Sequence, residues 1–484
     1  MDNKVRTYLI VCIHLIFIGL AMEAQTMPAA GYSVGTPPPT ASVVQQLSAG
    51  QAPLAGSRAV ALQPGTISLT LLDAIDRGLK HNLGIILSEQ GNRSARAARI
   101  RALSELLPHV SARAGESVQQ VNLAAYGIPL SPGTPSIIGP FSIFDSRALL
   151  TESLEFNYLY KERAAQQDIK AAQFSYQNTR DLIVLVVGSS YLQALADSSR
   201  VESVTAQVQT AQALYDQAVN LKNAGMTAGI DVLRAQVELQ AQQQRLLVAK
   251  NDYDKQLLTL ARTIGLPMGQ DFNLADTMPA SSPVPLTFDE ALKRAYDKRS
   301  DYHQVQAQVQ AAELSLKAAK AERLPSLGVN GDYGILGKTP GNSHGTFTAA
   351  AGLSIPIFQG GKIEADIMQA DTVLQQRQAQ LDDLRQRIEY EVRTAFLDVN
   401  AATQQLQVAT SALNVAREQV AQSRDRFSAG VTNTVEVVQA QEQRATAEEN
   451  YINSLYAHNV AKLNLARALG VAEDATKRFL GGQH

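Results

Sequence analysis

The residues best suited to chemistry in this sequence are two acids that follow glycine-centred turns. Asp231 comes shortly after Ala224-Gly225-Met226-Thr227, and Glu436 comes shortly after Ala429-Gly430-Val431-Thr432. Each acid falls near the start of an expected helix, where the helix dipole stabilises a carboxylate. For Asp231 this structural role is the preferred interpretation.

Other apparent signals for catalysis or ligand binding fail on spacing. The stretch Gly334-Ile-Leu-Gly-Lys338-Thr339 looks like part of a phosphate-binding loop, but Gly331 lies one residue too far from Gly337 for the Walker motif. The seven histidines show no metal-ligand spacing. No acid pair, Ser/His/Asp set or nucleophile elbow stands out from the helix-surface charges. We therefore expect no enzyme activity, no cofactor and no bound metal.

The composition argues against a nucleic-acid partner and favours extended helices. The 484 residues carry a formal net charge of −2, so they offer no basic footprint for DNA or RNA. Ala and Gln are abundant, aromatic residues make up 6% and Trp is absent. Hydrophobic residues spread thinly over long segments suit extended helical packing better than several compact cores.

Residues 1–24 have the pattern of a secretory signal peptide. A basic start precedes an apolar run from Tyr8 to Leu20, which is shorter than the ~20 residues that a membrane-spanning helix needs. The only cysteine, Cys12, lies inside this run, so the mature chain is expected to have neither disulfides nor thiolate metal sites. Residues 25–65 are rich in Pro, Ala, Ser and Gly, and we interpret them as a flexible extension.

One unit occurs twice in the chain. Helical stretches open at Leu69-Thr70 and Leu286-Thr287 and end at Leu-Pro pairs, each feature of the second copy following the first by 217 residues. The glycine-centred turns and the closing pairs Ile264-Gly265 and Leu469-Gly470 recur after 205 residues. A period near 200 residues indicates an internal duplication rather than a solenoid of small repeats.

This duplication sets the expected domain boundaries. The first repeat covers residues 66–265 and the second covers 286–470. A Pro-rich linker at 266–285 separates them, and a C-terminal tail follows at 471–484. Each repeat is a helix, a β-hairpin and a long helical hairpin. The strands are expected at about 108–125, 141–160, 325–337 and 345–358, and the helical hairpins at about 161–264 and 360–469.

The long helices carry coiled-coil stripes. In the second repeat, apolar residues recur in alternating steps of four and three from Ile388 to Phe427, with Ser423 as the one polar member. This is the 3.5-residue period of a coiled coil. The first repeat carries the stripe more loosely, from Ile183 to Ala218. The whole helical pattern from Lys362 to Phe427 corresponds to a rod of about 100 Å at ~1.5 Å per residue.

The strand segments alternate between apolar residues and small or polar ones. In the second repeat the apolar set begins with Leu327, Val329, Tyr333 and Ile335. In the first repeat it includes Val110 and Ala112 on one arm and Leu154, Phe156, Tyr158 and Tyr160 on the other. Such strands can pack on a core or stand in a lipid-facing barrel. No separate apolar helix pattern lies beside them as a cover, so we favour the barrel.

Four strands per chain constrain the assembly. No segment after the leader reads as apolar enough to cross a bilayer as a helix, so membrane insertion would have to use strands. Bilayer-spanning barrels need at least about eight strands. Three copies giving twelve strands is the simplest closure, because two copies would leave a filled interior and no channel.

Over about residues 69–470 this pattern resembles the TolC family of outer-membrane efflux proteins. The resemblance rests on the duplication, the Leu-Pro junctions at Pro108 and Pro325, the turn Ser354-Ile-Pro-Ile-Phe-Gln-Gly-Gly-Lys362, the paired tip motifs and the Leu-Gly endings. It implies a mainly α fold with a β-barrel portion. Three chains would form a twelve-stranded β-barrel in the outer membrane of a Gram-negative-type bacterium, continued by a twelve-helix α-barrel across the periplasm.

The resemblance also implies function and partners. Members of this family are passive ducts that join an inner-membrane pump through a periplasmic adaptor and export small molecules or polypeptides. The expected partners are two further copies of the chain, the adaptor, the pump and outer-membrane lipid. Small residues at the helical tips form the adaptor grooves in the family, a role that passes here to Gly225, Met226, Thr227, Gly430, Val431 and Thr432.

The resemblance assigns the periplasmic entrance as well. Glu436 aligns with an acidic position of the closed entrance, and three-fold symmetry would bring three carboxylates together in a ring that favours cations. Gln439 stands where the family often has a second acid, and Thr432 stands where a basic residue can lock the closed tip. The expected constriction therefore comprises Glu436, Gln439 and Asp231, without the family's salt-bridged lock.

A periplasmic coiled-coil structural or adaptor protein without channel activity is the alternative. The helices alone fit either class. An adaptor would place a single hairpin among small β domains, whereas this chain duplicates the whole helix–strand unit. A cell-envelope enzyme is a further alternative, which the lack of a catalytic constellation disfavours.

Overall fold

The computed structural model describes most of both repeats. The expected signal peptide, nearly all of the extension 25–65, and part of the linker 266–285 lie outside the described residues, as do Gly430 and the last residues of the tail. The described residues are 54, 56–58, 60–62, 64–127, 133, 135–279, 286–429, 431–432 and 434–479. All of them belong to one compact unit that spans Leu47–His484.

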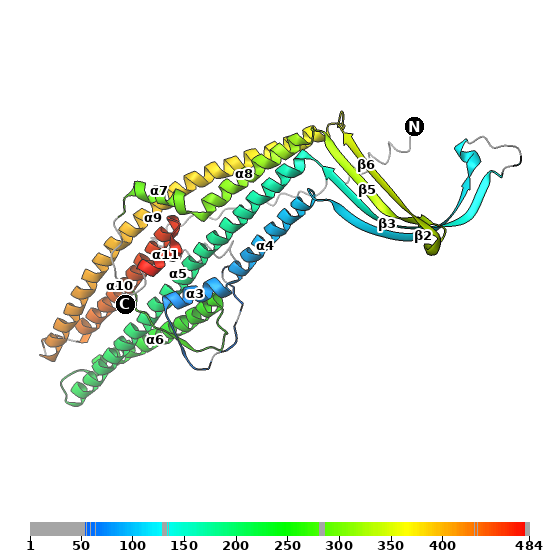
Figure 1. Cartoon of the computed structure of the whole chain (residues 1–484). Coiled ribbons are helices and arrows are strands. Elements are labelled where there is room, and N and C mark those ends of the chain that lie inside the picture. Colours follow the sequence, from blue (N-terminus) through cyan, green and yellow to red (C-terminus); the bar gives the residue numbers. More distant parts are fainter. Residues whose placement is uncertain are drawn as a thin grey trace, which may run out of the picture. The chain divides into compact units, whose positions relative to one another are not determined.

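The order of elements repeats along the chain (Figure 1). The first half contains β1 (Ile67–Leu69), α3 (Leu71–His81), α4 (Leu83–Ser104), β2 (His109–Asn122), the 3-10 helix η2 (Leu123–Tyr126), β3 (Ile137–Leu154), α5 (Phe156–Asn223), α6 (Gly229–Ile264) and β4 (Phe272–Leu274). The second half contains α7 (Phe288–Lys298), α8 (Ser300–Ala321), β5 (Ser326–Gly337), the 3-10 helix η3 (Pro340–Asn342), β6 (Ser343–Ser354), α9 (Lys362–Ser428), α10 (Thr434–Ala468) and α11 (Ala472–Phe479).

Two strands end earlier than the sequence pattern predicts. The strand expected to reach residue 160 stops at Leu154, and Phe156, Tyr158 and Tyr160 form the first turns of α5. Their alternation imitates a strand, but here it belongs to a 68-residue helix that packs on α4 and α8. The strand expected to reach residue 358 stops at Ser354. Pro356 follows, and a proline cannot donate a ladder hydrogen bond.

Three smaller features were not anticipated. Each expected first helix is two helices, broken at Asn82 in the first half and at Arg299 in the second. The strands β1 and β4 pair in parallel, joining the start of the first repeat to the expected linker. The expected C-terminal tail contains α11.

The four long strands form an antiparallel sheet in the order β2-β3-β5-β6. The alternation is in register across all four. One row of paired residues is Ala112, Ala148, Tyr333 and Phe347, and the next row is Arg113, Arg147, Gly334 and Thr346. The sheet therefore has an apolar face and a polar face. Its outer strands, β2 and β6, pair with no further strand among the described residues.

The helix α5 is the centre of the helical region. It packs against α4, α6, α8 and α10, while α9 packs against α8 and α10 (Figure 1). The heptad stripe expected on α9 is buried, with Ile388 and Val392 fully enclosed. One 18-residue window of α5 is long and apolar enough to cross a membrane, contrary to the expectation that no such segment follows the leader. That window is 72% buried in the protein, as suits the core helix of a pack.

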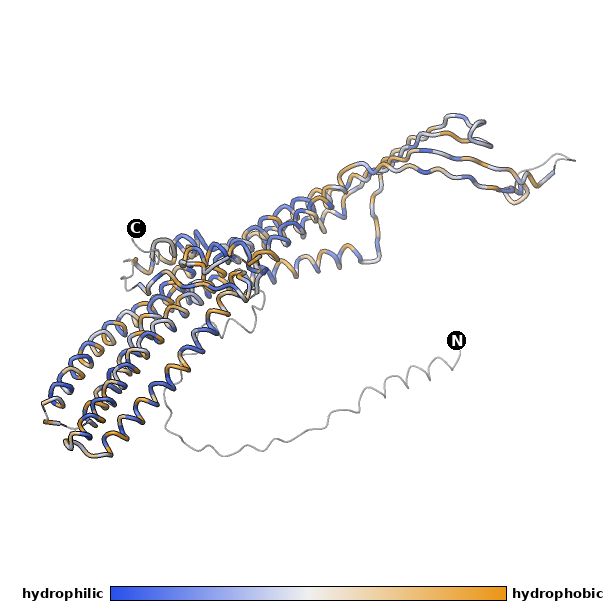
Figure 2. Tube along the Cα trace, turned by 90° about the horizontal axis from the view of Figure 1, so that it is seen from below, coloured by the Kyte–Doolittle hydropathy of each residue, from blue (hydrophilic) through white to orange (hydrophobic). Residues whose placement is uncertain are grey.

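Hydropathy along the trace supports the same interpretation of the long helices. In Figure 2, hydrophobic and hydrophilic residues interchange along each of them, which is the pattern of stripes that pack on neighbours. A continuous lipid-spanning segment would be apolar on all sides.

The breaks in the first helices occupy equivalent positions, 217 residues apart, but are stabilised differently. Asn82 caps α4 by accepting from the Gly84 amide (2.9 Å), and its side-chain amide donates to the carbonyls of Leu54 (2.7 Å) and Thr263 (3.1 Å). Arg299 is only 2% exposed and binds Asp301 (2.7 Å) and Glu391 (2.6 Å) instead. In the second repeat, ion pairs therefore stabilise the same helix break.

The glycine that ends each repeat packs directly on its break. Gly265 and Gly470 both have left-handed backbones, with φ of +79° and +69°. A Cβ on Gly265 would lie 2.6 Å from the His81 Cβ, and one on Gly470 would lie 2.7 Å from the Arg299 nitrogen. These contacts are too close for any side chain, so the repeated Leu-Gly and Ile-Gly endings close each unit onto its own first helices.

Replacing Gly470 by Ala should destabilise the protein by about 2 kcal/mol or more, because the left-handed backbone penalises a Cβ and the contacted atoms are backbone. The measurement is the thermal unfolding midpoint in detergent. Gly91→Ala is the control, because Gly91 lies in α4 and an added Cβ there would meet nothing within 4 Å, and it should leave the midpoint unchanged or raise it. Equal midpoints for the two variants would contradict this role of Gly470.

A partly buried charge cluster surrounds Arg299. Arg467 of α10 approaches Asp301 (3.8 Å), and Arg180 of α5 binds Glu473 of α11 (2.9 Å). Asp181 lies beside these groups, and burial raises its pKa to about 6, with Glu473 and Asp301 adding to the rise and Arg467 opposing it. A raised pKa in the folded state means that the ionised form of Asp181 lowers stability at neutral pH.

Asp181→Asn should therefore raise the unfolding midpoint at pH 7.5, by a free energy of order 1 kcal/mol. The gain should shrink as the pH falls from about 6 toward 4, because the wild-type carboxyl then becomes protonated in the folded state. Midpoints measured across this range test the sign. Asp398→Asn on the exposed surface of α9 is the control and should show no such trend. A pH-independent gain for Asp181→Asn would refute this explanation.

Candidate functional site

The two helical hairpins end in turns of the same construction. After α5, the Met226 amide donates to the Leu221 carbonyl (2.9 Å), and after α9 the Val431 amide donates to the Arg426 carbonyl (2.9 Å). This five-residue backward bond is the Schellman ending of a helix, which requires a left-handed residue. Gly225 supplies it with φ of +74°. Gly430, the equivalent residue, lies outside the described residues.

Both turns present an apolar side chain to solvent. Met226 is 74% exposed and Val431 is 69% exposed. Thr227 and Thr432 follow them, and each threonine turns its hydroxyl back onto an acid of the next helix. The exposed apolar pair therefore remains available to a partner, whereas the threonines are engaged in the fold.

Asp231 sits in the first turn of α6 with partners from its own hairpin. The Thr227 hydroxyl donates to its carboxylate (2.9 Å), and the Arg234 guanidinium lies 3.3 Å from it. The position also complements the positive end of the helix dipole. These contacts are those of a carboxylate at a helix start, and the assignment of Asp231 to the entrance constriction stays a prediction.

Glu436 occupies the equivalent place at the start of α10. The Thr432 hydroxyl donates to one carboxylate oxygen, and the Arg426 Nε lies 3.5 Å from the other. The Arg426 side chain comes from the last turn of α9, on the other side of the turn. This pairing was not predicted from the sequence, because it depends on the fold of the turn.

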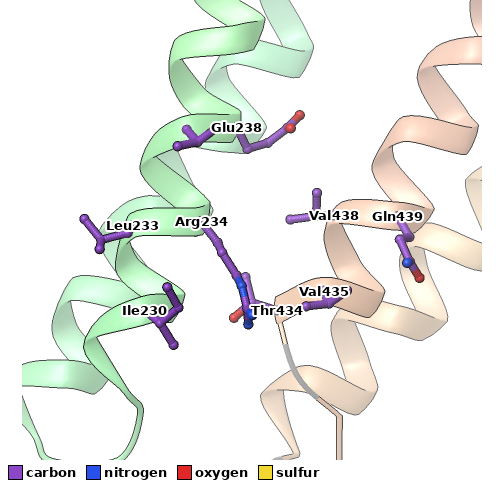
Figure 3. Close-up of a pocket in the computed structure, with 9 residues that line it drawn as sticks. Ile230, Leu233, Arg234, Glu238, Thr434, Val435, Val438 and Gln439 are labelled. Carbon is purple, nitrogen blue, oxygen red and sulfur yellow. The ribbon is translucent and has the colours of Figure 1, made fainter.

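Gln439 lies on α10, three residues beyond Glu436. It lines a groove of about 450 Å³ between α6 and α10, together with Val435 and Val438. Figure 3 shows residues of the two helices facing each other across this groove. The α6 wall is formed by Ile230, Leu233, Arg234, Val237 and Glu238, and Thr434 completes the α10 wall. The groove is mostly apolar, and the assignment of Gln439 to the entrance constriction stays a prediction.

The described residues contain no group of three or more His, Cys, Asp or Glu side chains arranged to hold a metal ion. The tips contain carboxylates, hydroxyls and guanidinium groups in separate local pairs. Such an arrangement can attract or repel ions and dock a partner, but it offers no general acid–base pair within the described part of either hairpin.

Comparison with known proteins decides the family. The family model for outer membrane efflux proteins matches residues 159–266 and 291–471, which together are more than half of the chain and include both hairpins and their tips. This chain belongs to the outer membrane efflux protein family. The TolC-family resemblance inferred from the duplicated motifs is thereby confirmed, and the protein is placed in the outer membrane.

Relatives and solved structures extend the match over most of the chain. The outer membrane protein TolC of Escherichia coli K12 is 22% identical over 389 residues, covering 77% of this chain and 76% of TolC. The alkaline protease secretion protein AprF of Pseudomonas aeruginosa is 24% identical over 331 residues, covering 65% and 66%. The Campylobacter jejuni CmeC outer membrane channel superposes with a TM-score of 0.72 at 16% identity, covering 95% and 97%. The fold of this family member is thus that of an outer-membrane channel protomer.

Family membership also separates the function classes. An outer membrane efflux protein is a transport component, and the comparisons give nothing in favour of a structural coiled-coil protein or an adaptor. The family is one of efflux proteins rather than enzymes.

Proposed function

We propose that three copies of this chain close into a passive duct that crosses the outer membrane and the periplasm. The observation that carries the proposal is that a single protomer leaves both of its sides unfinished, in the sheet and in the helices alike. The duct would dock through a periplasmic adaptor onto an inner-membrane pump, which supplies the energy.

The sheet is unfinished at β2 and β6. The unpaired N–H and C=O groups of an edge strand cannot stay unsatisfied in lipid, so a spanning sheet must close. Side chains on both outer strands are exposed as well, including Val110 and Val118 of β2 and Phe347 and Leu353 of β6. Pairing β6 of one copy with β2 of the next satisfies both edges at once, and three copies give twelve strands.

The polar face of the sheet suits a water-filled lumen. Arg147 of β3 lies 2.6 Å from Asp145 and 3.0 Å from Asp332 of β5, and Arg113 of β2 lies 3.6 Å from Asp145. Charged networks of this kind belong on the interior of a membrane barrel, because lipid-facing charges are costly. The opposite, apolar face would then contact lipid.

The helix α9 is unfinished in the same way. Besides its buried stripe it carries a second stripe at the same 3.5-residue period, and this stripe is exposed. A helix with two apolar stripes needs partners on two sides. The apolar members of the exposed stripe are Tyr390, Leu397, Ala401, Val408 and Val415, with the polar Gln404 and Ser411 between them.

The complementary surface lies on α6, at the other side of the helical region. In the two helical hairpins the helices pack in the order α6, α5, α10 and α9. The helices α6 and α9 therefore lie at the two outer sides of this row. Outside the groove that faces α10, the exposed large hydrophobic side chains of α6 are Leu247, Val248 and Leu258. A contact between α9 of one copy and α6 of the next is heterologous, and such contacts generate a closed ring when the rotation between copies closes.

The tips would face the partners. We assign adaptor docking to Gly225, Met226 and Thr227 and to Gly430, Val431 and Thr432, with Met226 and Val431 as the exposed apolar contacts. We keep Glu436 as the acid of the periplasmic entrance. Relatives are named for alkaline protease secretion, pyoverdine export and toluene efflux. One architecture therefore serves different cargoes, and we assign the choice of cargo to the pump and adaptor.

A charge in the exposed α9 stripe should block assembly. Val408→Glu buries an unpaired carboxylate at the expected contact between copies, and we expect it to abolish both trimers in detergent and conductance in planar bilayers. The neighbouring polar variant Gln407→Glu adds the same charge off the stripe and should keep both. Wild-type protein that inserts into bilayers without conducting would refute the duct, and conducting Val408→Glu trimers would refute this interface.

A further inference from the structure

We propose that Arg426 sets the charge of the periplasmic entrance by pairing with Glu436 of its own protomer. The inference rests on the proposed function, in which Glu436 faces the entrance. It changes what that entrance is: three compensated acid–guanidinium pairs instead of a bare ring of three carboxylates.

The geometry of the pair is local to one hairpin. Arg426 approaches Glu436 from α9, across the turn, with the Nε atom 3.5 Å from one carboxylate oxygen. The Thr432 hydroxyl binds the other oxygen, so the carboxylate is held from two directions. Both charged side chains keep an exposed part, 57% for Arg426 and 37% for Glu436. The pair is therefore formed within one copy of the chain. It still faces solvent, where its charges can interact with ions.

The two repeats place this cation on different helices. In the first repeat the acid is Asp231, the hydroxyl is that of Thr227, and the cation is Arg234, three residues further along the same helix. The position equivalent to Arg234, 205 residues later, is Gln439. The position equivalent to Arg426, 205 residues earlier, is the apolar Leu221.

Each hairpin thus keeps one threonine, one acid and one arginine, although the arginine comes from a different helix in each. If the carboxylate needed no counter-charge, the presence of an arginine beside it in both repeats would have no explanation. Position 439 of the second repeat carries a glutamine, which lines the groove between α6 and α10 with Val435 and Val438. Arg234 lines the α6 side of the same groove, so both repeats contribute to it.

The consequence for ions follows from distance. Coulomb interaction falls with separation, so a guanidinium in contact with Glu436 outweighs carboxylates of other copies across an opening. A compensated entrance should bind polyvalent cations weakly. Removing Arg426 should expose the three carboxylates together and convert the entrance into a cation site. The nearby α9 charges Arg424 and Asp425 are exposed and should contribute a smaller, general field.

Single-channel recordings with hexamminecobalt(III) on the periplasmic side test the proposal. Arg426→Gln should tighten the block about tenfold, and Arg426→Lys, which keeps the charge, should stay close to wild type. Arg424→Gln removes the same charge two residues away and should change the block less than twofold. Glu436→Gln should weaken the block, and adding Arg426→Gln to it should have no further effect.

Equal effects of Arg426→Gln and Arg424→Gln would overturn the inference, as would a full Arg426→Gln effect in the Glu436→Gln background. Hydrogen exchange gives a second readout that needs no current. Arg426→Gln should speed amide exchange in the first turn of α10, residues 434–438, whereas Arg424→Gln should not, and unchanged exchange would show that the pair does not hold the tip. A wild type without conductance refutes the duct itself, whereas a conducting wild type with a failed variant series refutes only the role of Arg426.

Discussion

The structure depends on one constraint, which is that a four-stranded sheet has two edges and a bilayer offers no hydrogen-bond partner for either. Backbone groups in lipid must be satisfied within the protein, so in the proposed duct the sheet β2-β3-β5-β6 continues into another copy. The helices need a partner for a different reason, which is the hydrophobic effect. The exposed apolar side chains of α9 and α6 leave apolar surface in water. Hydrogen bonding and burial therefore favour the same closure.

The duplication gives the chain two units built to the same plan. Each repeat closes on itself through a left-handed glycine, which packs against the break between the first two helices of that repeat. The two repeats differ in how they stabilise the same helix break: Asn82 does so with neutral hydrogen bonds and Arg299 with ion pairs. The tips follow the same rule, with Arg234 on the acid's own helix in one copy and Arg426 across the turn in the other.

The sequence predicted the features that a repeating pattern encodes. The α9 stripe, the alternating strands and the glycine turns are periodic or duplicated, so each residue supports the next. Features that depend on a local competition between helix and strand, or on a single contact, were not predicted. Phe156, Tyr158 and Tyr160 alternate like a strand, and only the packing of α5 decides that they are helical. The pairing of Arg426 with Glu436 was missed because it needs the fold of the turn, which periodicity does not describe.

The central claim is that the protomer is one third of a closed cylinder. Native mass spectrometry of the detergent-extracted, full-length protein tests it most directly. The account predicts a single dominant species of three copies, with no stable monomer at working concentrations. A dominant monomer or dimer would contradict it, because both leave the sheet without the twelve strands that a conducting barrel of this design requires.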